Sequence, residues 1–353
     1  MLRMTRLLQV AAFGLLLTFN QAASAAEKTS FKVGWSIYVG WMPWDYAQSS
    51  GILKKWADKY GIKIELTQVN DYVESINQYT AGQFDACVMT NMDMLTIPAA
   101  GGVESTALII GDYSNGNDGI VLKGAGKKLP DIKGQQVNLV ELSVSHYLLA
   151  RALGTVGMAE RDVKVVNTSD ADIVAASAAA SVTAVVTWKP LLTEIMARPG
   201  NTLVFDSSKT PGEILDLMVV NSKVLKDNPK LGRALVGAWY ETIALMKAGD
   251  AKALAHMAKA SGATVEEFKS MLATTHMYWT PAEALAAYNS ADLVKTNDLV
   301  RKFSFEKGLL GEGAKSADAV GIAFPAGKSL GSSSNIRMRF DPTYVQMAAD
   351  GKL

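Results

Sequence analysis

The sequence contains very little cysteine and histidine. Cys87 is the one cysteine among 353 residues, so the chain cannot form an internal disulfide bond or a multi-cysteine metal site. It lies within an apolar stretch, where we expect a buried, inert thiol. His146, His256 and His276 are scattered along the chain, which argues against a zinc site. We therefore predict neither a metal nor a cofactor.

Several catalytic signatures are also missing. The sequence has no Gly-x-Ser-x-Gly elbow, no His-Glu-x-x-His helix and no Gly-x-Gly-x-x-Gly turn. The stretch 321–329 ends in Gly-Lys-Ser, but five residues separate its two glycines, whereas a phosphate-binding loop needs four. We interpret it as a surface loop.

Charge of one sign is not in excess either. The 35 basic and 34 acidic residues give a net charge of +1, so nothing indicates nucleic acid or an acidic membrane surface as a partner. Residues 1–25 have the pattern of a signal peptide: Arg3 and Arg6, then an apolar run at 7–19, then Ala23-Ser24-Ala25. No later segment offers 18 uninterrupted apolar residues. We expect a soluble protein of the periplasm.

The first part of the mature chain alternates between two hydrophobic periods. Stretches at 31–38, 62–69 and 86–89 are typical of strands, and helical patterns lie between them at 43–61 and 72–80. This order is βαβαβ, which predicts a parallel-type sheet with right-handed crossovers.

The same alternation returns further along the chain. Residues 137–140, 163–166 and 183–187 have strand character, 215–220 reads as a returning strand, and 222–303 is helical in pattern. We therefore predict an α/β protein of two lobes, each with its own sheet and helices. The predicted divisions are lobe 1 at 31–114 plus 222–310, lobe 2 at 119–219, and a C-terminal loop or tail at 311–353.

Three short motifs occur at defined places in this order. Ala81-Gly82-Gln83-Phe84-Asp85 precedes the strand at 86–89, Leu129-Pro130-Asp131-Ile132-Lys133-Gly134 opens the second lobe, and Trp188-Lys189-Pro190 follows a strand. Together they resemble the type II periplasmic solute-binding proteins of nitrate, sulfonate and taurine importers, over about 31–303. The resemblance implies two lobes that close about a double-crossing hinge on a small solute. It also implies an ABC transporter permease in the inner membrane as partner, no catalysis, and a monomer.

The strand ends that this fold turns toward the cleft are rich in acids and poor in bases. Ligands of open α/β sheets bind beyond such ends. The cleft segments contain one lysine, Lys189, one histidine, His146, and these acids: Asp45, Asp71, Asp93, Asp112, Asp118, Glu141, Asp170 and Asp172. The acids at helix starts also cap free N–H groups, and Asp112 and Asp118 suit hinge turns equally well.

Asp93 and Glu141 are the strongest candidates for ligand contacts, because each directly follows a strand, one in each lobe. Two buried carboxylates without a cation would cost several kcal/mol per ion. An oxyanion would need arginine, lysine or helix N-termini as donors. A small cation instead suits the acids, and aromatic faces add about 0.5–2 kcal/mol each. A planar guanidinium matches both.

Two stretches resemble one branch of the family, the binding proteins associated with urea carboxylases. They are Thr90-Asn91-Met92-Asp93 and Glu141-Leu142-Ser143-Val144-Ser145-His146-Tyr147. That branch implies urea or guanidine, and the charge balance favours guanidine. The predicted ligand-binding residues are Trp35, Trp41, Trp44, Asp71, Asn91, Asp93, Glu141, Ser145, His146 and Trp188. Two alternatives stay open: a binding protein for an anion such as nitrate, sulfonate or taurine, and a periplasmic enzyme using Asp93 and Glu141 as acid and base.

Overall fold

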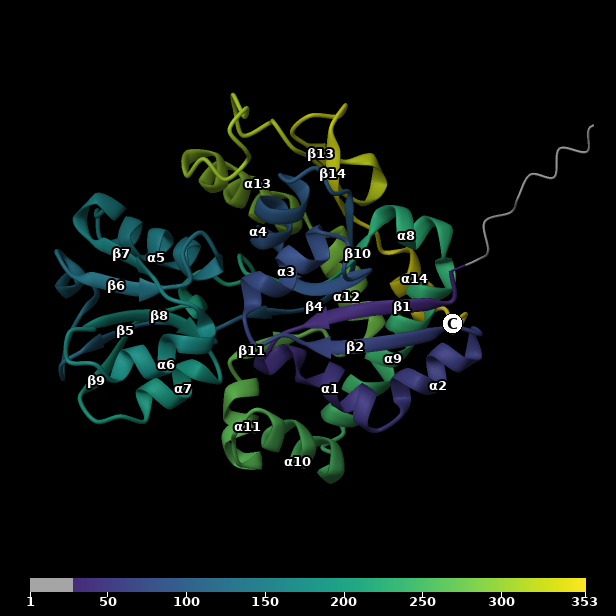
Figure 1. Ribbon diagram of the computed structural model, residues 1–353, viewed down its shortest axis with the longest axis horizontal. Coiled ribbons are helices and arrows are strands. Elements are labelled where there is room, and N and C mark those ends of the chain that lie inside the picture. Colours follow the sequence, from purple (N-terminus) through teal and green to yellow (C-terminus); the bar gives the residue numbers. More distant parts are fainter. Residues whose placement is uncertain (1–27) are drawn as a thin grey trace, which may run out of the picture.

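The structure, a computed structural model, describes residues 28–353. The expected signal peptide at 1–25 lies outside the described residues. Figure 1 shows two lobes side by side, joined by two crossings of the chain. None of the described helices is both long and apolar enough to cross a membrane.

Lobe 1 is built on the larger sheet, with strand order β13-β12-β14-β4-β10-β3-β1-β2 and β11 paired to β4. β1 runs parallel to both β2 and β3, as the βαβαβ pattern predicts, whereas β10 is antiparallel to β3 and β4. The strands are β1 (Ser30–Trp35), β2 (Lys63–Gln68), β3 (Ala86–Thr90), β4 (Ser105–Ser114), β10 (Leu215–Asn221), β11 (Thr275–Met277), β12 (Gly321–Ala323), β13 (Ser329–Leu330) and β14 (Ile336–Phe340).

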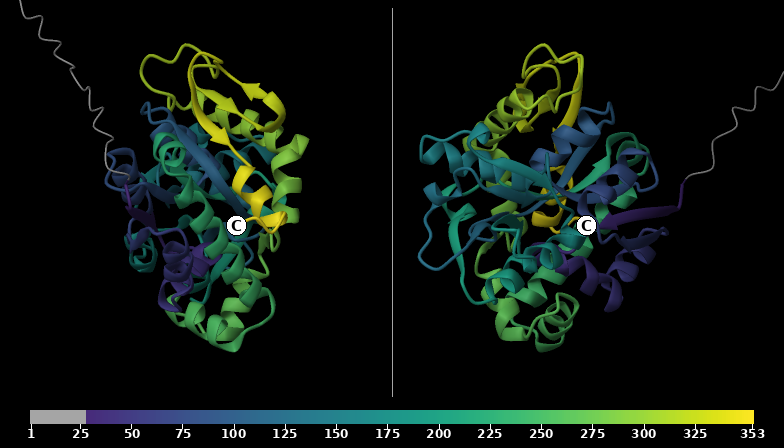
Figure 2. Two further views of the ribbon diagram at one scale, coloured as in Figure 1. Left: turned by 90° about the vertical axis from the view of Figure 1, so that its right-hand side faces the viewer. Right: turned by 60° about the vertical axis from the view of Figure 1, so that its left-hand side comes forward.

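Helices cover the faces of this sheet (Figures 1 and 2). They are α1 (Met42–Ser49), α2 (Ile52–Lys59), α3 (Tyr72–Thr80), α4 (Asn91–Met94), α8 (Ser222–Asp227), α9 (Pro229–Lys247), α10 (Ala251–Ala260), α11 (Val265–Leu272), α12 (Pro281–Asn289), α13 (Ala291–Glu306) and α14 (Thr343–Ala349). A π-helical turn, Leu95–Ala99, extends α4. Every residue of β3 is buried, and burial raises the pKa of the Cys87 thiol to about 12, so the thiol is protonated and inert at neutral pH.

Lobe 2 has a five-stranded sheet in the order β7-β6-β8-β5-β9. β6 is parallel to β7 and β8, and β5 is antiparallel to β8 and β9. The strands are β5 (Asp118–Lys123), β6 (Gln136–Leu139), β7 (Lys164–Asn167), β8 (Ala184–Trp188) and β9 (Asn201–Asp206), and the helices are α5 (Val144–Thr155), α6 (Asp170–Ala178) and α7 (Leu191–Met196).

The chain crosses between the lobes at 115–117, from β4 to β5, and at 207–214, from β9 to β10. β10 therefore belongs to the sheet of lobe 1, although 215–219 was predicted to close lobe 2. A short apolar run identifies a strand that is buried on both faces. It carries no information on which of the two sheets accepts that strand.

The prediction of a loop or tail at 311–353 is wrong. β14 pairs in parallel with β4 and extends the large sheet, and the ring of Phe340 stacks on Phe324 with centroids 5.4 Å apart. The yellow end of the chain in Figure 2 shows this addition at one edge of lobe 1. The segment Ile336–Phe340 alternates apolar residues with arginine, a period of two that indicates a strand. The surrounding glycines and serines obscured it.

The close approach of α2 and α9 generates a test of the packing. A Cβ on Gly237, in the buried face of α9, would lie 2.4 Å from Trp56, whose indole N–H is anchored on Glu241 at 2.7 Å. Gly237→Ala should therefore lower the free energy of unfolding by about 1–3 kcal/mol, measured in urea. Gly154→Ala is the matched control, because Gly154 is helical and has open space around it; it should stabilise by up to about 1 kcal/mol. Equal effects of the two substitutions would contradict the packing.

Candidate functional site

A small cavity of about 20 Å³ lies where the strand ends of the two lobes meet. Both lobes contribute to its wall, since β5, β8 and the start of α5 belong to lobe 2 and the rest to lobe 1. Its lining residues are Tyr38, Trp41, Tyr72, Thr90, Asp118, Val144, Trp188, Ile214 and Asp216. The position agrees with the rule that ligands bind beyond the carboxyl ends of strands in α/β proteins.

Four aromatic rings form one side of the cavity. Each ring contacts the next: Tyr38 and Trp41 have centroids 5.1 Å apart, Trp41 and Tyr72 5.7 Å, and Tyr72 and Trp188 5.6 Å. Trp188 comes from lobe 2, and its indole N–H donates to the carbonyl of Ile37 in lobe 1 at 3.2 Å. The aromatic wall is therefore completed only when the lobes are in contact.

Carboxylates form the other side. Asp118 and Asp216 line the cavity, and Asp112 is the cross-strand partner of Asp216 in the pairing of β4 with β10. The three are almost completely buried, with exposed fractions of 3%, 3% and 0%. Among the described residues that line the cavity there is no lysine, arginine or histidine.

The hydrogen bonds to these acids are few. The hydroxyl of Tyr38 donates to Asp112 Oδ1 at 3.0 Å, and that of Ser114 to Asp118 Oδ2 at 2.5 Å. Within the part of the chain that the structure describes, the Oδ2 atoms of Asp112 and Asp216 are buried without a hydrogen-bond partner. Buried acceptors of this kind normally have partners. A proton shared between the paired carboxyls of Asp112 and Asp216 satisfies part of this need, and Asp216, which lines the cavity, can also accept from a ligand.

Burial has a large effect on the protonation of this cluster. It raises the pKa of Asp112 and of Asp118 to about 7, against the hydrogen bonds that favour their charged forms. Burial, together with the charges of Asp112 and Asp118, raises the pKa of Asp216 well above its usual range. The cluster therefore resists full ionisation unless a positive charge enters it.

Asp93 lies behind the cavity wall. Its carboxylate accepts hydrogen bonds from the Tyr72 hydroxyl at 2.6 Å and the Thr90 hydroxyl at 2.7 Å. Burial raises its pKa to about 6, while these hydroxyls and the N–H of Val144, in the first turn of α5, oppose the rise. Asp93 therefore positions two wall residues and is not itself among the residues that line the cavity, while its Oδ1 is buried without a hydrogen-bond partner among the described residues.

Glu141 does not face Asp93. Its side chain is exposed and lines an outer groove together with Asp71, so the two strongest candidates for ligand contacts do not line one cavity. Asp71 caps α3, accepting from the N–H of Glu74 at 2.9 Å. Both residues follow strand ends, but strand-end position alone does not determine whether a side chain points into the cleft or out of it.

The remaining predicted residues divide between wall, core and interlobe contacts. Trp41 and Trp188 line the cavity, whereas Trp35 is buried in the core and Trp44 packs against Trp239 with ring centroids 5.2 Å apart and the rings tilted by 30°. Asn91 joins α4 to the second crossing, donating to the Glu213 carbonyl at 3.3 Å and accepting from the Leu215 N–H at 3.1 Å.

The two predicted residues on α5 do not line the cavity. Ser145 is buried, and within residues 28–353 its hydroxyl has no hydrogen-bond partner. His146 accepts from the Leu142 N–H through Nδ1 at 3.1 Å, and its Nε2 lies 3.2 Å from Glu160.

Asp216, Tyr72 and Tyr38 are wall residues that the sequence analysis missed, and Asp112 and Asp118 were noted there without being assigned. A signal for Asp216 was present, because an acid inside an otherwise apolar, fully buried strand is costly without a function. No comparable signal marks Tyr72, which resembles any aromatic residue in an amphipathic helix.

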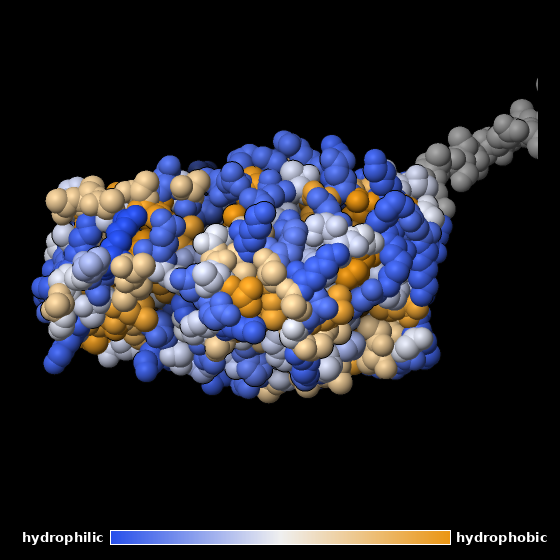
Figure 3. Space-filling view, turned by 90° about the horizontal axis from the view of Figure 1, so that it is seen from below, coloured by the Kyte–Doolittle hydropathy of each residue, from blue (hydrophilic) through white to orange (hydrophobic). Residues whose placement is uncertain are grey.

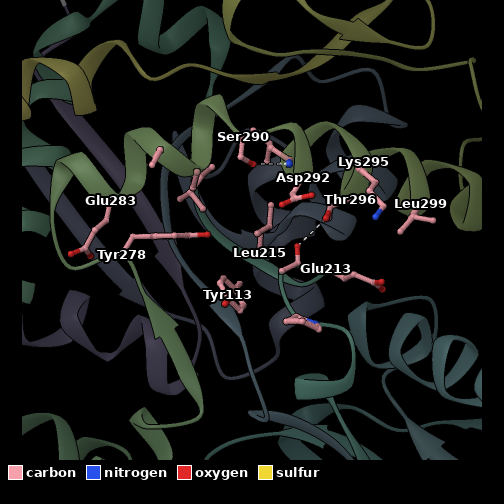
Figure 4. Close-up of a pocket in the computed structure, with 16 residues that line it drawn as sticks. Tyr113, Glu213, Leu215, Tyr278, Glu283, Ser290, Asp292, Lys295, Thr296 and Leu299 are labelled. Atoms are coloured by element: carbon pink, nitrogen blue, oxygen red, sulfur yellow. Dashed lines mark hydrogen bonds between the residues drawn. The ribbon is translucent and has the colours of Figure 1, made fainter.

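A second, larger hollow of about 410 Å³ lies beside α12 and α13 (Figure 4). There the Thr296 hydroxyl donates to the Gly212 carbonyl at 3.0 Å. The one acid from the crossing, Glu213, is already held by Arg151 at 2.8 Å and by Tyr147 at 2.7 Å. None of the described side chains that line it is a buried polar group lacking a partner. This hollow therefore makes a weaker candidate for a specific ligand than the cavity.

Comparisons with known proteins agree on the class. The family model described as NMT1/THI5 like matches residues 50–253, more than half of the chain. A candidate binding protein of Brucella abortus is 24% identical over 229 residues, covering 64% of this chain and 69% of that protein.

Solved structures agree on the fold. The alkanesulfonate-binding protein of Xanthomonas axonopodis pv. citri is 18% identical with a TM-score of 0.68, covering 84% of this chain and 99% of that one. The nitrate-binding protein of Synechocystis PCC 6803 is 14% identical with a TM-score of 0.57, covering 93% and 99%. At these identities the likeness shows the fold, and it confirms the predicted two-lobed architecture of periplasmic binding proteins.

The buried acids generate a prediction for pH dependence. Unfolded aspartates titrate near pH 4, whereas Asp112 and Asp118 titrate at about 7 in the folded protein. The folded state therefore binds more protons between those values, and the free energy of unfolding should fall as pH rises from about 4 to 7. Asp118→Asn removes one such group. Between pH 5 and pH 8, the free energy of unfolding of the variant should therefore rise relative to that of the wild type by about 1–4 kcal/mol.

Urea unfolding at both pH values, without added solute, measures this gain. Asp292→Asn is the control, because Asp292 is exposed and water hydrates its carboxylate in both states. Parallel behaviour of wild type and Asp118→Asn across the pH range would contradict the burial of an uncompensated acid.

Proposed function

The chain belongs to the NMT1/THI5-like family, and on this premise we propose that it is the periplasmic solute-binding component of an ABC importer. Its solute is a small, nitrogen-rich cation, guanidinium first and urea second, which it delivers to a permease in the inner membrane. The named neighbours in fold are binding proteins, which supports binding without turnover. The enzyme alternative has little support, because Asp93 is buried behind the wall and Glu141 is exposed.

The observation that carries the proposal is the pairing of carboxylates with aromatic rings around one cavity. Asp118 and Asp216 offer acceptors, and the Oδ2 of Asp216 is buried without a partner among the described residues. A cation at this point would compensate the buried charges. The rings of Trp41 and Trp188 would add cation–π attraction of about 0.5–2 kcal/mol each.

The size of the cavity restricts the solute to a few heavy atoms. A volume of about 20 Å³ is little more than the roughly 10–15 Å³ that one water molecule requires on the same measure. Guanidinium, urea and nitrate are all planar with four heavy atoms and need more room than this, so the wall must widen to admit any of them and size does not separate them. Charge does: guanidinium favours ionisation of the neighbouring acids and offers N–H groups that match carboxylate oxygens, urea is neutral, and nitrate would oppose that ionisation and find no basic side chain among the described residues that line the cavity.

Contacts between the lobes support capture by hinge closure. The N–H of Tyr72 in lobe 1 donates to Asp170 Oδ1 of lobe 2 at 3.1 Å, and Lys189 of lobe 2 donates to the hydroxyl of Thr274 at 3.0 Å. Such side-chain contacts are easily broken, whereas the two crossings are continuous with β4 and β10. The lobes can therefore open and close as rigid bodies by breaking these contacts and bending at the two crossings.

The site predicts which substitutions weaken binding. Asp216→Asn and Asp118→Asn each keep the shape of the side chain but remove a charge next to the solute. Loss of a charge-assisted hydrogen bond costs about 1.5–3 kcal/mol, so the dissociation constant for guanidinium should rise by about ten- to a hundredfold. Calorimetric titration of wild type and both variants with guanidinium, urea and nitrate measures the change.

Glu65→Gln is the control, since this exposed acid lies on β2 and does not line the cavity. Urea should respond less than guanidinium to both aspartate substitutions, because no net charge is being paired. Nitrate binding more tightly than guanidinium to the wild type would contradict the assignment. So would unchanged guanidinium binding in both variants.

Closure predicts a change of shape in solution. Small-angle scattering of the wild type should give a smaller radius of gyration with saturating guanidinium than without it, because the lobes rotate toward each other about the two crossings. Asp216→Asn at the same guanidinium concentration controls for effects of the salt itself. An unchanged radius of gyration at a concentration shown to saturate the site would contradict capture by closure.

A further inference from the structure

Two grooves flank the cavity, and each is formed by both lobes. One, of about 220 Å³, runs between the start of α3 and the ends of β6 and β7. The other, of about 660 Å³, runs between α6 and α7 of lobe 2 and the turn from α10 to α11 of lobe 1. The acids that line them, which we call the acidic rim, are Asp71, Glu74, Glu141, Asp170, Glu194 and Glu267.

The acidic rim contains no compensating base. Among the described residues that line either groove there is no lysine, arginine or histidine. The whole chain carries 35 basic and 34 acidic residues, so its overall charge does not explain an all-acidic pair of grooves. Figure 3 views the face that carries α10 and α11, where hydrophilic side chains are interspersed with small apolar groups. No broad apolar patch covers this face, as docking of a large apolar partner would require.

The grooves adjoin the cavity through two of its wall residues. Tyr72 lies between Asp71 and Val73 of the first groove, and its N–H donates to Asp170 of the second at 3.1 Å. Trp188 donates to the carbonyl of Ile37, which lines the second groove. Tyr72 and Trp188 come from different lobes and meet edge to face at 5.6 Å. Both rings line the cavity and contact or adjoin residues of the grooves, so their separation on opening would connect the cavity with the rim.

The cavity that these grooves adjoin is lined by acids as well, which indicates the same sign of charge for the solute. Asp216 lines the same cavity as these two rings, is 3% exposed, and has an Oδ2 atom without a hydrogen-bond partner among residues 28–353. A cleft lined by charge of one sign focuses its field and raises the local concentration of the opposite ion, which can increase association rates by about 10- to 1000-fold. The field of exposed groups decays over about 8–10 Å at physiological ionic strength, which is enough to span a groove.

We propose that the acidic rim is an electrostatic entrance that speeds the capture of cationic solutes, separately from the buried acids that hold them. This inference rests on the proposed function. It gives Glu141, which lies outside the cavity, a role in the rate of association. It also predicts that substitutions at the rim and in the cavity alter different rate constants.

The test uses the double variant Glu141→Gln/Glu194→Gln. Both side chains are exposed, and neither lies in the cavity wall. Glu65→Gln/Glu312→Gln is the matched control, with the same change in net charge at exposed positions outside both grooves. Stopped-flow fluorescence with guanidinium as the probe, read through Trp41 and Trp188 in the cavity wall, yields the association and dissociation rate constants over a range of NaCl concentrations.

At low salt the rim variant should associate about three- to tenfold more slowly than wild type, with its dissociation rate unchanged. The difference should disappear toward 1 M salt, where the screening length is about 3 Å. The control should match wild type. Unchanged association in the rim variant, or a change confined to dissociation, would overturn the entrance while leaving the cavity proposal intact. If wild type binds no guanidinium at equilibrium, both proposals fail.

Discussion

The constraint on which the rest of the site depends is the burial of three carboxyl groups at strand ends where, among the described residues, no basic side chain lines the cavity. Asp112, Asp118 and Asp216 are each at most 3% exposed, and burial raises the pKa of all three. A protein keeps such a cluster only at a cost in free energy, since each uncompensated charge in a poorly solvated place is unfavourable. A bound cation removes that cost, so the energetic weakness of the ligand-free site is also the source of its affinity.

The fold places these acids on the same segments that connect the lobes. Asp112 lies near the end of β4 and Asp118 at the start of β5, on either side of the first crossing. Asp216 follows the second crossing, in β10. Because the hinge strands carry the carboxylates, a rotation between the lobes also changes the arrangement of charges around the solute. Trp188 adds the last ring of the wall from lobe 2, so binding and closure depend on common residues.

Much of the architecture followed from sequence periodicity. The βαβαβ order of 31–90 and the second alternation predicted two α/β lobes, and an acidic, aromatic cleft followed from the strand ends. What periodicity could not supply was the sheet to which an isolated apolar strand belongs. The sheet that contains β10 was therefore not predicted, and Asp216 on that strand was not recognised as a cavity residue. The C-terminal strands escaped detection for a related reason, because β13 has two residues and β12 three, too few to show a period.

Part of the site was predicted incorrectly because the direction of a side chain after a strand cannot be read from the residue pattern. Asp93 and Glu141 occupy equivalent places in sequence, each just after a strand, yet one is fully buried and the other exposed. Side-chain direction after a strand depends on the turn that follows, and Leu142 adopts a left-handed conformation with φ of 64° immediately after Glu141. Backbone geometry of that kind is rare for leucine and was not visible in the residue pattern. Trp41 and Trp188 line the cavity because their backbones are held by a 3₁₀ turn and by a central strand.

The central claim is that this cluster of buried acids holds a small cation. The most direct measurement is a crystal structure grown at neutral pH with guanidinium, compared with one grown with nitrate. The account predicts a planar ion in the cavity with guanidinium, its N–H groups within hydrogen-bond distance of Asp118 and Asp216 and its faces against Trp41 or Trp188. It predicts no ion in the cavity with nitrate. Nitrate bound among these carboxylates, or guanidinium bound only elsewhere on the protein, would contradict it.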